Sequence, residues 1–222
     1  MDNIYNVIIL DESGSMSSIY KETLTGINEV LNGIKISQEK HHDQCHFVTI
    51  VTFEGNGMEG VKTRRDRVPI DAVKPFTEDD YRPGGCTPLY DAMGKTLHEV
   101  EGQIDERDKV FVTVITDGME NASTEYSGKI IKNLVARLRE KGWVLAYIGA
   151  NQDSIEVARD LNIGNALNYS ATGKGVKDMS VKWSRSSMRL YEKFAEGEDL
   201  RHYENLFESE ETKAPKEQNP GQ

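Results

Sequence analysis

The stretch Val7–Met16, VIILDESGSM, decides the fold, because a short apolar run ends abruptly in a carboxylate, two hydroxyls and a glycine. The apolar part predicts a strand over about 4–10 that is buried on both faces, as in the middle of a parallel sheet. The polar part is then the loop at the carboxyl end of that strand, where open α/β sheets place their ligand crevice.

Three side chains of this loop point to a metal site. Asp11, Ser13 and Ser15 alternate along the loop, with a glycine between the serines, and can turn three oxygen donors toward one point. Hard cations such as Mg²⁺ are held by such oxygens, with some positions left to water. A simpler interpretation stays open, in which the serines cap the next helix and Asp11 favours its positive N-terminus.

Composition excludes several classes of function. The 222 residues carry a net charge of −10, which argues against sequence-independent binding to nucleic acid or to anionic membranes. Cys45 and Cys86 form no CxxC pattern, so a zinc knuckle or redox motif is not supported, and a reduced pair is the simpler expectation. Because the chain shows no basic leader and no apolar run that could span a bilayer, we expect a cytoplasmic protein.

Strand and helix patterns alternate along the rest of the chain. They predict an α/β fold with a mostly parallel sheet, one antiparallel edge strand and helices on both faces. The expected strands after the first are 46–53, 61–68, 110–115, 143–148 and 164–169, and the main helices are 20–34, 89–100, 130–138 and 176–194. We assign 1–196 to one domain and 197–222 to a C-terminal extension, which docks loosely at Leu206 and Phe207 and is disordered from about 209.

Two further segments carry polar residues to the places where a site would form. The second buried strand ends in Thr116-Asp117-Gly118, so two strands of one parallel sheet would each deliver an aspartate to the same edge. Thr87 lies in the loop 84–88, GGCTP, directly before a helix in which Pro88 is expected as the first residue. The Thr87 hydroxyl is equally suited to cap that helix, and the residues alone leave both roles open.

Two charged clusters have simple structural explanations. The run 41–46, HHDQCH, matches no standard zinc spacing and is expected to be a solvated turn between a helix and a strand. The basic residues of 61–68 suit either a docking patch for an acidic partner or an edge strand that is kept charged to prevent pairing with other chains. We favour the edge strand, because charge runs are usually solvated faces.

The ordered set formed by Asp11-x-Ser13-x-Ser15, Thr87 and Asp117 resembles the metal-ion-dependent adhesion site of the von Willebrand factor type A domain family. The resemblance covers about 4–169 and implies the Rossmann-like, three-layer fold of that family. It also implies that Ser13, Ser15 and Thr87 bind Mg²⁺, or else Mn²⁺ or Ca²⁺, through their hydroxyls. Asp11 and Asp117 would act directly or through water.

The function that this resemblance implies is a non-enzymatic, metal-dependent protein-binding module. Two carboxylates and three hydroxyls leave the cation electrophilic, so that an acidic side chain of a protein partner completes its coordination. We expect a monomer that serves in an intracellular assembly, for instance beside an ATPase. Glu12 and Glu120 adjoin the ligands and are expected to be solvated.

Two alternatives belong to other classes of protein. The first is an aspartate-based phosphoryl-transfer hydrolase with Asp11 as nucleophile. In such enzymes a second aspartate two residues later is the general acid, and Ser13 stands in its place here. The second is a structural domain whose metal site stays unoccupied.

Overall fold

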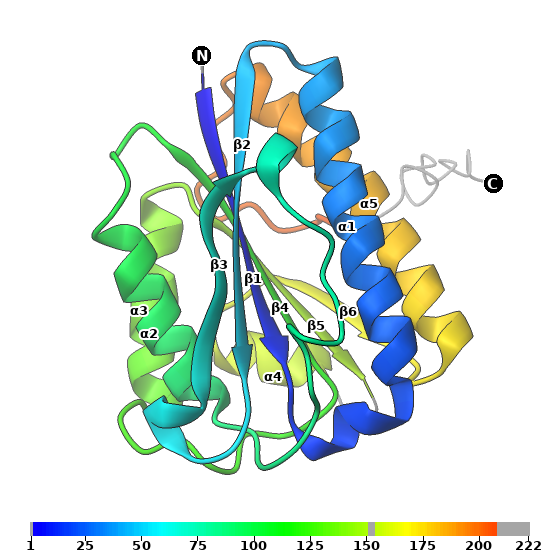
Figure 1. Cartoon of the computed structure of the whole chain (residues 1–222). Helices are drawn as coiled ribbons and strands as arrows, with labels where there is room; N and C mark the ends of the chain where they lie inside the picture. Colours follow the sequence, from blue (N-terminus) through cyan, green and yellow to red (C-terminus); the bar gives the residue numbers. More distant parts are fainter. Residues whose placement is uncertain (1, 151–153, 208–222) are drawn as a thin grey trace, which may run out of the picture.

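The computed structural model describes residues 2–150 and 154–207, which form a central sheet with helices on both faces (Figure 1). The sheet has six strands in the order β3-β2-β1-β4-β5-β6, and only β3 runs antiparallel to its neighbour. The strands are β1 Asp2–Asp11, β2 Gln44–Phe53, β3 Val61–Pro69, β4 Lys109–Thr116, β5 Val144–Ala150 and β6 Asn165–Tyr169. The α-helices are α1 Tyr20–Lys40, α2 Leu89–Glu101, α3 Gly128–Glu140, α4 Ser154–Asp160 and α5 Gly173–Ala195. The predicted α/β architecture is therefore confirmed.

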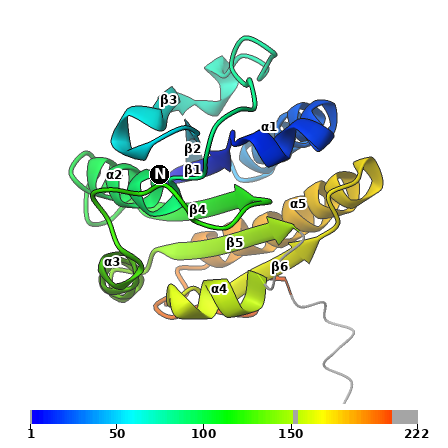
Figure 2. The same ribbon diagram turned by 90° about the horizontal axis from the view of Figure 1, so that it is seen from below.

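β1 lies in the middle of the sheet and is buried on both faces, as its apolar run predicts. Ile8 and Leu10 pack in one core cluster with residues of α1 and α5. Val7 and Ile9 point the other way, into a cluster with residues of α2 and α3. The view from below shows α1 and α5 on one side of the strands and α2 and α3 on the other (Figure 2).

The strand order changes direction between β1 and β4, because later strands are added on one side of β1 first and then on the other. From β1 the chain moves through α1 to β2 on one side, whereas from β4 it moves through α3 to β5 on the other. Such a reversal opens a crevice at the carboxyl ends of the two strands, which is where open α/β sheets bind ligands. β1 and β4 pair in parallel up to Leu10 and Ile115, so Asp11 and Thr116 come next to each other at this edge.

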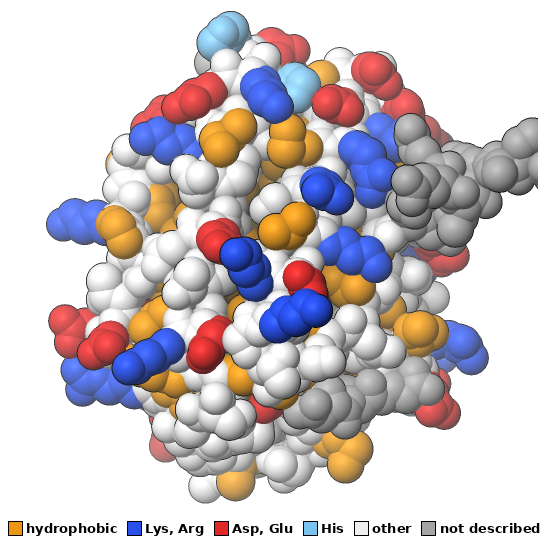
Figure 3. Space-filling model, turned by 90° about the vertical axis from the view of Figure 1, so that its right-hand side faces the viewer, with side chains coloured by type: hydrophobic (Ala, Val, Ile, Leu, Met, Phe, Trp, Pro, Cys, Tyr) orange, Lys and Arg blue, Asp and Glu red, His pale blue; other side chains and the backbone are white. Residues whose placement is uncertain are grey.

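The basic residues of β3 are mostly engaged in ion pairs within the molecule. Lys62 pairs with Glu54, Arg64 with Glu12, Arg65 with Asp80 and Arg67 with Asp66. β3 is an edge strand, which agrees with the favoured interpretation of its charge. The outer surface over α1 and α5 likewise mixes acidic and basic side chains without one large patch of either sign (Figure 3).

The histidine-rich run contributes two buried residues to β2, Gln44 and His46. Residues 42 and 43 form a turn, as predicted, but His46 lies inside β2, is 1% exposed and contacts Asn6 and Gln44. Within the described ranges, no group of three or more histidine, cysteine or acidic residues is arranged to hold a metal ion.

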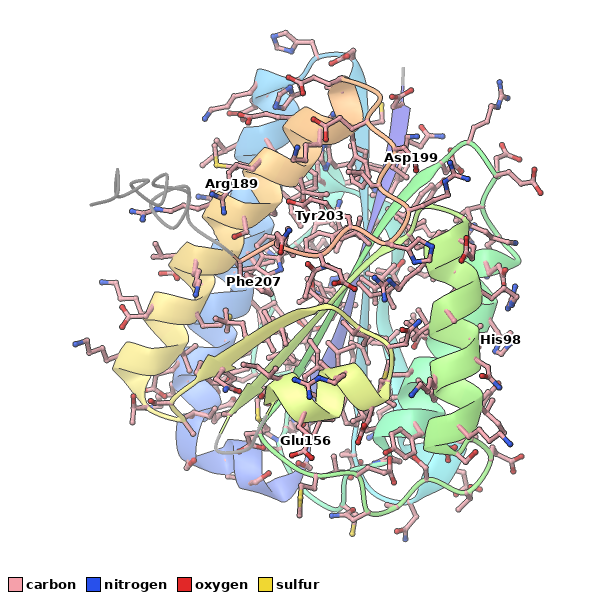
Figure 4. All side chains as sticks on the ribbon, turned by 180° about the vertical axis from the view of Figure 1, so that it is seen from behind. His98, Glu156, Arg189, Asp199, Tyr203 and Phe207 are labelled. Atoms are coloured by element: carbon pink, nitrogen blue, oxygen red, sulfur yellow. The ribbon has the colours of Figure 1, made fainter. Side chains whose placement is uncertain are left out.

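The segment after α5 packs more firmly than expected. Leu200 and Leu206 are buried, and the side chain of Asn165 hydrogen-bonds to the backbone of Tyr203 and of Leu206. Figure 4, seen from behind, shows this segment crossing in front of the strands from Asp199 through Tyr203 to Phe207. The predicted disorder from about 209 lies outside the described residues.

Three smaller expectations can be compared with the structure. β5 continues through Gly149 and Ala150, which were expected in a turn, and the rest of that turn, 151–153, lies outside the described residues. In the part of the chain that the structure describes, no helix is both long enough and apolar enough to span a membrane. Cys45 and Cys86 are both free thiols.

Candidate metal centre

The last residues of β1 and β4 are joined by a side-chain hydrogen bond. The Thr116 hydroxyl donates to Oδ2 of Asp11 at 2.5 Å, and Oδ1 of Asp11 accepts the backbone N–H of Ser13 at 2.7 Å. Asp11 and Thr116 are both 0% exposed. Both oxygens of the Asp11 carboxylate are therefore held in fixed directions, with Oδ2 toward the crevice between the two strands.

The two serines of the first loop connect that loop to the loop after β4. The hydroxyl oxygens of Ser13 and Ser15 lie 3.1 Å apart, and the Ser15 hydroxyl donates to Oδ1 of Asp117 at 2.5 Å. Ser13 is buried, whereas Ser15 is exposed and Asp117 half-buried. The group of oxygens is therefore closed toward the protein and open toward solvent.

Gly118 marks the point at which the three loops meet. A Cβ atom added to Gly118 would lie 3.1 Å from Oγ1 of Thr87 and 3.6 Å from both Oδ2 of Asp11 and Oγ of Ser15. These three oxygens come from two segments of the chain, the end of β1 with the loop after it and the loop 84–88, and they surround a space that a side chain at Gly118, on the loop after β4, would enter. The structure therefore brings together all five residues that the sequence singles out, including Ser13 and Asp117 through their bonds to Ser15.

The structure does not support the alternative in which the hydroxyls of Ser13 and Thr87 cap the helices that follow them. A 3₁₀ helix over Gly14–Ile19 follows Ser13, and the Ser13 side chain makes no capping hydrogen bond to it. α2 begins at Leu89, so Pro88 takes the N-cap position, where Thr87 was the expected cap and Pro88 the expected first helical residue. The first free N–H groups of α2, those of Tyr90 and Asp91, bond instead to side chains of Glu120 and Ser123.

The electrostatics of the site favour a bound cation. Burial raises the pKa of Asp11 to about 6, opposed by its hydrogen bonds and reinforced by the nearby charge of Asp117. Burial also raises the pKa of Asp117. Among the described residues, neither carboxylate forms an ion pair with a lysine, arginine or histidine. Two acidic groups thus share a partly buried space without a counter-charge, which is costly unless a cation neutralises them.

The donor set fits a hard divalent cation. Carboxylate and hydroxyl oxygens are the ligands that Mg²⁺ and Ca²⁺ prefer, and no softer ligand is among the five. The space beside Gly118 is bordered by three of these oxygens, and the exposure of Ser15 leaves one side open to water or to another molecule. The arrangement can therefore hold a cation and still offer it an outside ligand.

The expectation that Glu12 and Glu120 are solvated is wrong. Glu12 is 1% exposed, pairs with Arg64 at 2.8 Å and accepts the backbone N–H of Arg82. Glu120 is half-buried and accepts the backbone N–H groups of Tyr90, Ala122 and Ser123. Both glutamates hold loops in place, because each accepts backbone N–H groups of those loops.

Sequence reasoning missed three residues that shape the site. Thr116 was noted only as the end of the second buried strand, although a hydroxyl at the end of a strand beside β1 is suited to reach Asp11. Tyr81 donates its hydroxyl to the backbone oxygen of Asp11 at 2.8 Å, across 70 positions of sequence. Asn121 bonds to the backbone of Thr87. No local pattern marks the last two, because their partners are distant in the chain.

Comparisons with known proteins agree with this fold. A search of curated protein sequences finds no match. Similar solved structures include the pilus adhesin SpaC from Lactobacillus rhamnosus GG, with a TM-score of 0.62 and 11% identity over 86% of this chain and 30% of that one. Proximal thread matrix protein 1 from the mussel byssus has a TM-score of 0.59 and 14% identity over 84% of this chain and 46% of that one.

A third similar structure is a von Willebrand factor type A protein from Catenulispora acidiphila, with a TM-score of 0.58 and 12% identity over 84% of this chain and 43% of that one. The chain thus spans less than half the length of each of these three structures. The sequence model of the von Willebrand factor type A domain matches residues 7–176, which hold the second half of β1, the other five strands and all five candidate ligands. This chain therefore belongs to the von Willebrand factor type A domain family, whose domains are generally protein-interaction modules.

Proposed function

We propose that the chain is a non-enzymatic protein-binding module that depends on a divalent metal. Asp11, Ser13, Ser15, Thr87 and Asp117 would hold the cation, with Mg²⁺ as the first candidate and Mn²⁺ or Ca²⁺ as alternatives. The observation that carries the proposal is the meeting of three loops at Gly118, where two uncompensated carboxylates face hydroxyl oxygens. When bound, the metal supplies a positive charge that attracts an outside oxygen ligand.

The open side of the site suggests which ligand a partner offers. Ser15 and Gly85 are exposed and Asp117 is half-buried, so an approaching side chain can reach the cation from solvent. A carboxylate of a protein partner is the natural ligand, because it brings both an oxygen and a compensating charge. We expect this contact to form in an assembly, for instance one that contains an ATPase. The two free thiols, one of them exposed, suit a reducing compartment such as the cytoplasm.

The phosphoryl-transfer alternative is disfavoured by the position of Asp11. A nucleophilic carboxylate must reach the phosphorus atom of its substrate, but Asp11 is 0% exposed and both of its oxygens accept hydrogen bonds. We therefore expect no phosphatase turnover that depends on Asp11.

Thermal unfolding tests the proposal directly. In Mg²⁺ or Mn²⁺ at about one hundred times the dissociation constant, the parent should gain about 2.7 kcal/mol over the chelated protein, or roughly 5–10 °C in Tm. Asp11→Ala should lose this gain. Asp79→Ala is the matched control, because its carboxylate is 92% exposed on a nearby loop and should leave the gain intact.

Two outcomes would contradict the proposal. Identical melting curves of the parent with metal and with chelator would favour the structural domain with an unoccupied site. Turnover of a phosphate ester that is lost in Asp11→Ala would favour the hydrolase. If the metal response is present, purification from source cells in Mg²⁺ and in chelator identifies the partner as the protein retained only with metal and lost in Asp11→Ala.

A further inference from the structure

Thr87 is held in place by one residue of another loop. The backbone N–H of Thr87 donates to Oδ1 of Asn121 at 2.8 Å, and the N–H of Asn121 donates to the carbonyl oxygen of Thr87 at 3.2 Å. Within the described residues, these are the hydrogen bonds that the structure shows at the backbone of Thr87. Pro88 follows and has no N–H of its own, so it bonds to the backbone of α2 through its carbonyl oxygen, which accepts the N–H of Ala92 at 3.0 Å.

Neighbouring contacts make the loop that carries Asn121 a firm support. Glu120 and Ser123 accept the N–H groups of Tyr90 and Asp91 at the start of α2. In return, the buried carboxylate of Asp91 accepts the N–H groups of residues 124, 125 and 126, at 2.8, 2.9 and 2.8 Å. The loop after β4 and the start of α2 are thus bonded in both directions.

This reciprocal bonding has a consequence for the metal site. Asp117 and Asn121 belong to the same short loop, so the loop that carries one candidate ligand also fixes the backbone of another. Ser13 is held by bonds within its own loop, and Ser15 also bonds to Asp117, whereas the backbone of Thr87 depends on Asn121, 34 positions away. A small shift of Thr87 would remove its hydroxyl from the space beside Gly118.

We propose that Asn121 is a positioning residue of the metal site, which acts by holding Thr87 within reach of the cation. This inference rests on the proposed metal-binding function. Asn121 touches the backbone of Thr87 and is itself exposed, so it acts through Thr87 and does not belong to the buried core. Partners that orient a metal ligand commonly change metal affinity by about 10–100-fold when they are removed.

The first experiment measures the dissociation constant of Mn²⁺ for the parent and for three variants by electron paramagnetic resonance. Asn121→Ala removes the acceptor and should weaken binding about 10-fold. Asn121→Asp keeps an oxygen at the same place and should bind as tightly as the parent or tighter. Asn121→Glu adds the same charge but moves the oxygen one methylene farther, and should bind less tightly than Asn121→Asp.

The second experiment asks whether Asn121 acts through Thr87. Water-proton relaxation of the Mn²⁺-loaded protein counts the waters on the ion, and loss of the Thr87 hydroxyl should add one. Thr87→Ala and Asn121→Ala should each show this increase. The double variant Thr87→Ala/Asn121→Ala should bind Mn²⁺ no more weakly than Thr87→Ala, because residues that act as a unit are not additive. Tm in chelator confirms that each variant is folded.

The outcomes separate this inference from the proposed function. A parent that does not bind Mn²⁺ overturns both. A parent that binds Mn²⁺, with Asn121→Ala binding equally well, overturns only the role of Asn121. If Asn121→Asp and Asn121→Glu bound Mn²⁺ equally tightly, the added charge and not the position of the side-chain oxygen would matter, and the role of Asn121 would be overturned. Full additivity of the two losses in the double variant would overturn it as well.

Discussion

The hydroxyl of Thr116 donates a 2.5 Å hydrogen bond to Oδ2 of Asp11, and so joins the last residues of β4 and β1 at the edge of the sheet. The same hydroxyl oxygen accepts the N–H of Gly118 at 3.1 Å. One buried side chain thus fixes both the direction of the Asp11 carboxylate and the start of the loop that carries Asp117. This relation links the stability of the sheet edge to the geometry of the candidate metal site.

Replacing Thr116 with valine should therefore weaken the fold and the site together. Valine has nearly the same shape but leaves Oδ2 of Asp11 and the N–H of Gly118 without this partner, at a cost of about 1–3 kcal/mol. Urea unfolding in chelator measures this loss. Thr116→Ser keeps the hydroxyl and should stay within about 1 kcal/mol of the parent. A Thr116→Val protein as stable as the parent would contradict the structural role of this bond.

Neutralising Asp11 should stabilise the protein in chelator and abolish its response to metal. The pKa of Asp11 is raised to about 6 in the fold, above its ordinary value of 3.8, so ionisation of Asp11 favours the unfolded chain at every pH above this range. Asp11→Asn removes this penalty, which amounts to at most about 3 kcal/mol at pH 8. Thr116 can donate to Gly118 and accept from the new amide, so the hydrogen bonding survives.

The measurement is a pair of melting curves at pH 8, with chelator and with Mg²⁺. Asp11→Asn should unfold at a higher temperature than the parent in chelator, and its Tm should not change when Mg²⁺ is added. At pH 4 the advantage over the parent should shrink, because Asp11 is then largely protonated in the folded protein. A lower Tm in chelator at pH 8 would mean that the carboxylate stabilises the metal-free fold.

The parts of the structure that are encoded locally could be predicted from the sequence. The apolar run before Asp11, the second one before Thr116 and the helical spacing between them fix the strand and helix order, and parallel strands bring their carboxyl ends to one edge. The candidate ligands follow from that edge. What holds them could not be predicted, because Tyr81, Glu120 and Asn121 act on partners that lie 30–70 positions away.

Buried polar residues were the main source of error, and the reason is physical. A glutamate after a strand is solvated in most proteins, but Glu12 meets Arg64 from the edge strand and is enclosed by it. Leu206 was expected to dock loosely in a polar segment, yet Asn165 holds its backbone N–H at 3.0 Å. In both cases one long-range partner reverses the local preference, and no spacing in the sequence identifies that partner.

His46 should make the stability of the protein depend on pH. Burial lowers the pKa of His46 to about 4, whereas an unfolded histidine titrates near 6.5. Between these values the unfolded chain binds more protons than the folded protein. The free energy of unfolding should therefore be highest above pH 6.5 and fall by up to about 3 kcal/mol as the pH drops toward 4.

The comparison of the parent with His46→Gln isolates this effect, because glutamine is polar but does not titrate. The difference in free energy of unfolding between parent and variant should change between pH 7 and 4.5 by about 2–3 kcal/mol, to the disadvantage of the parent. His41, which also lowers the pKa of His46, lies at the surface end of α1 and is unchanged in both proteins. A difference that is constant with pH would contradict the burial of a neutral imidazole.

The ion pair between Arg64 and Glu12 should matter far more than the more exposed pair between Lys62 and Glu54. Glu12 is nearly inaccessible, so Arg64→Met leaves a buried carboxylate without its cation and should cost about 2 kcal/mol or more. Lys62→Met is the matched control on the same strand, because Lys62 is 45% exposed and its loss should cost less than about 1 kcal/mol. Glu12→Gln combined with Arg64→Met should recover part of the loss, since the neutral amide still accepts the N–H of Arg82. Urea unfolding of the parent, the two single variants and the double variant measures these differences in the free energy of unfolding. Equal losses in Arg64→Met and Lys62→Met would mean that the Glu12 carboxylate is hydrated in solution.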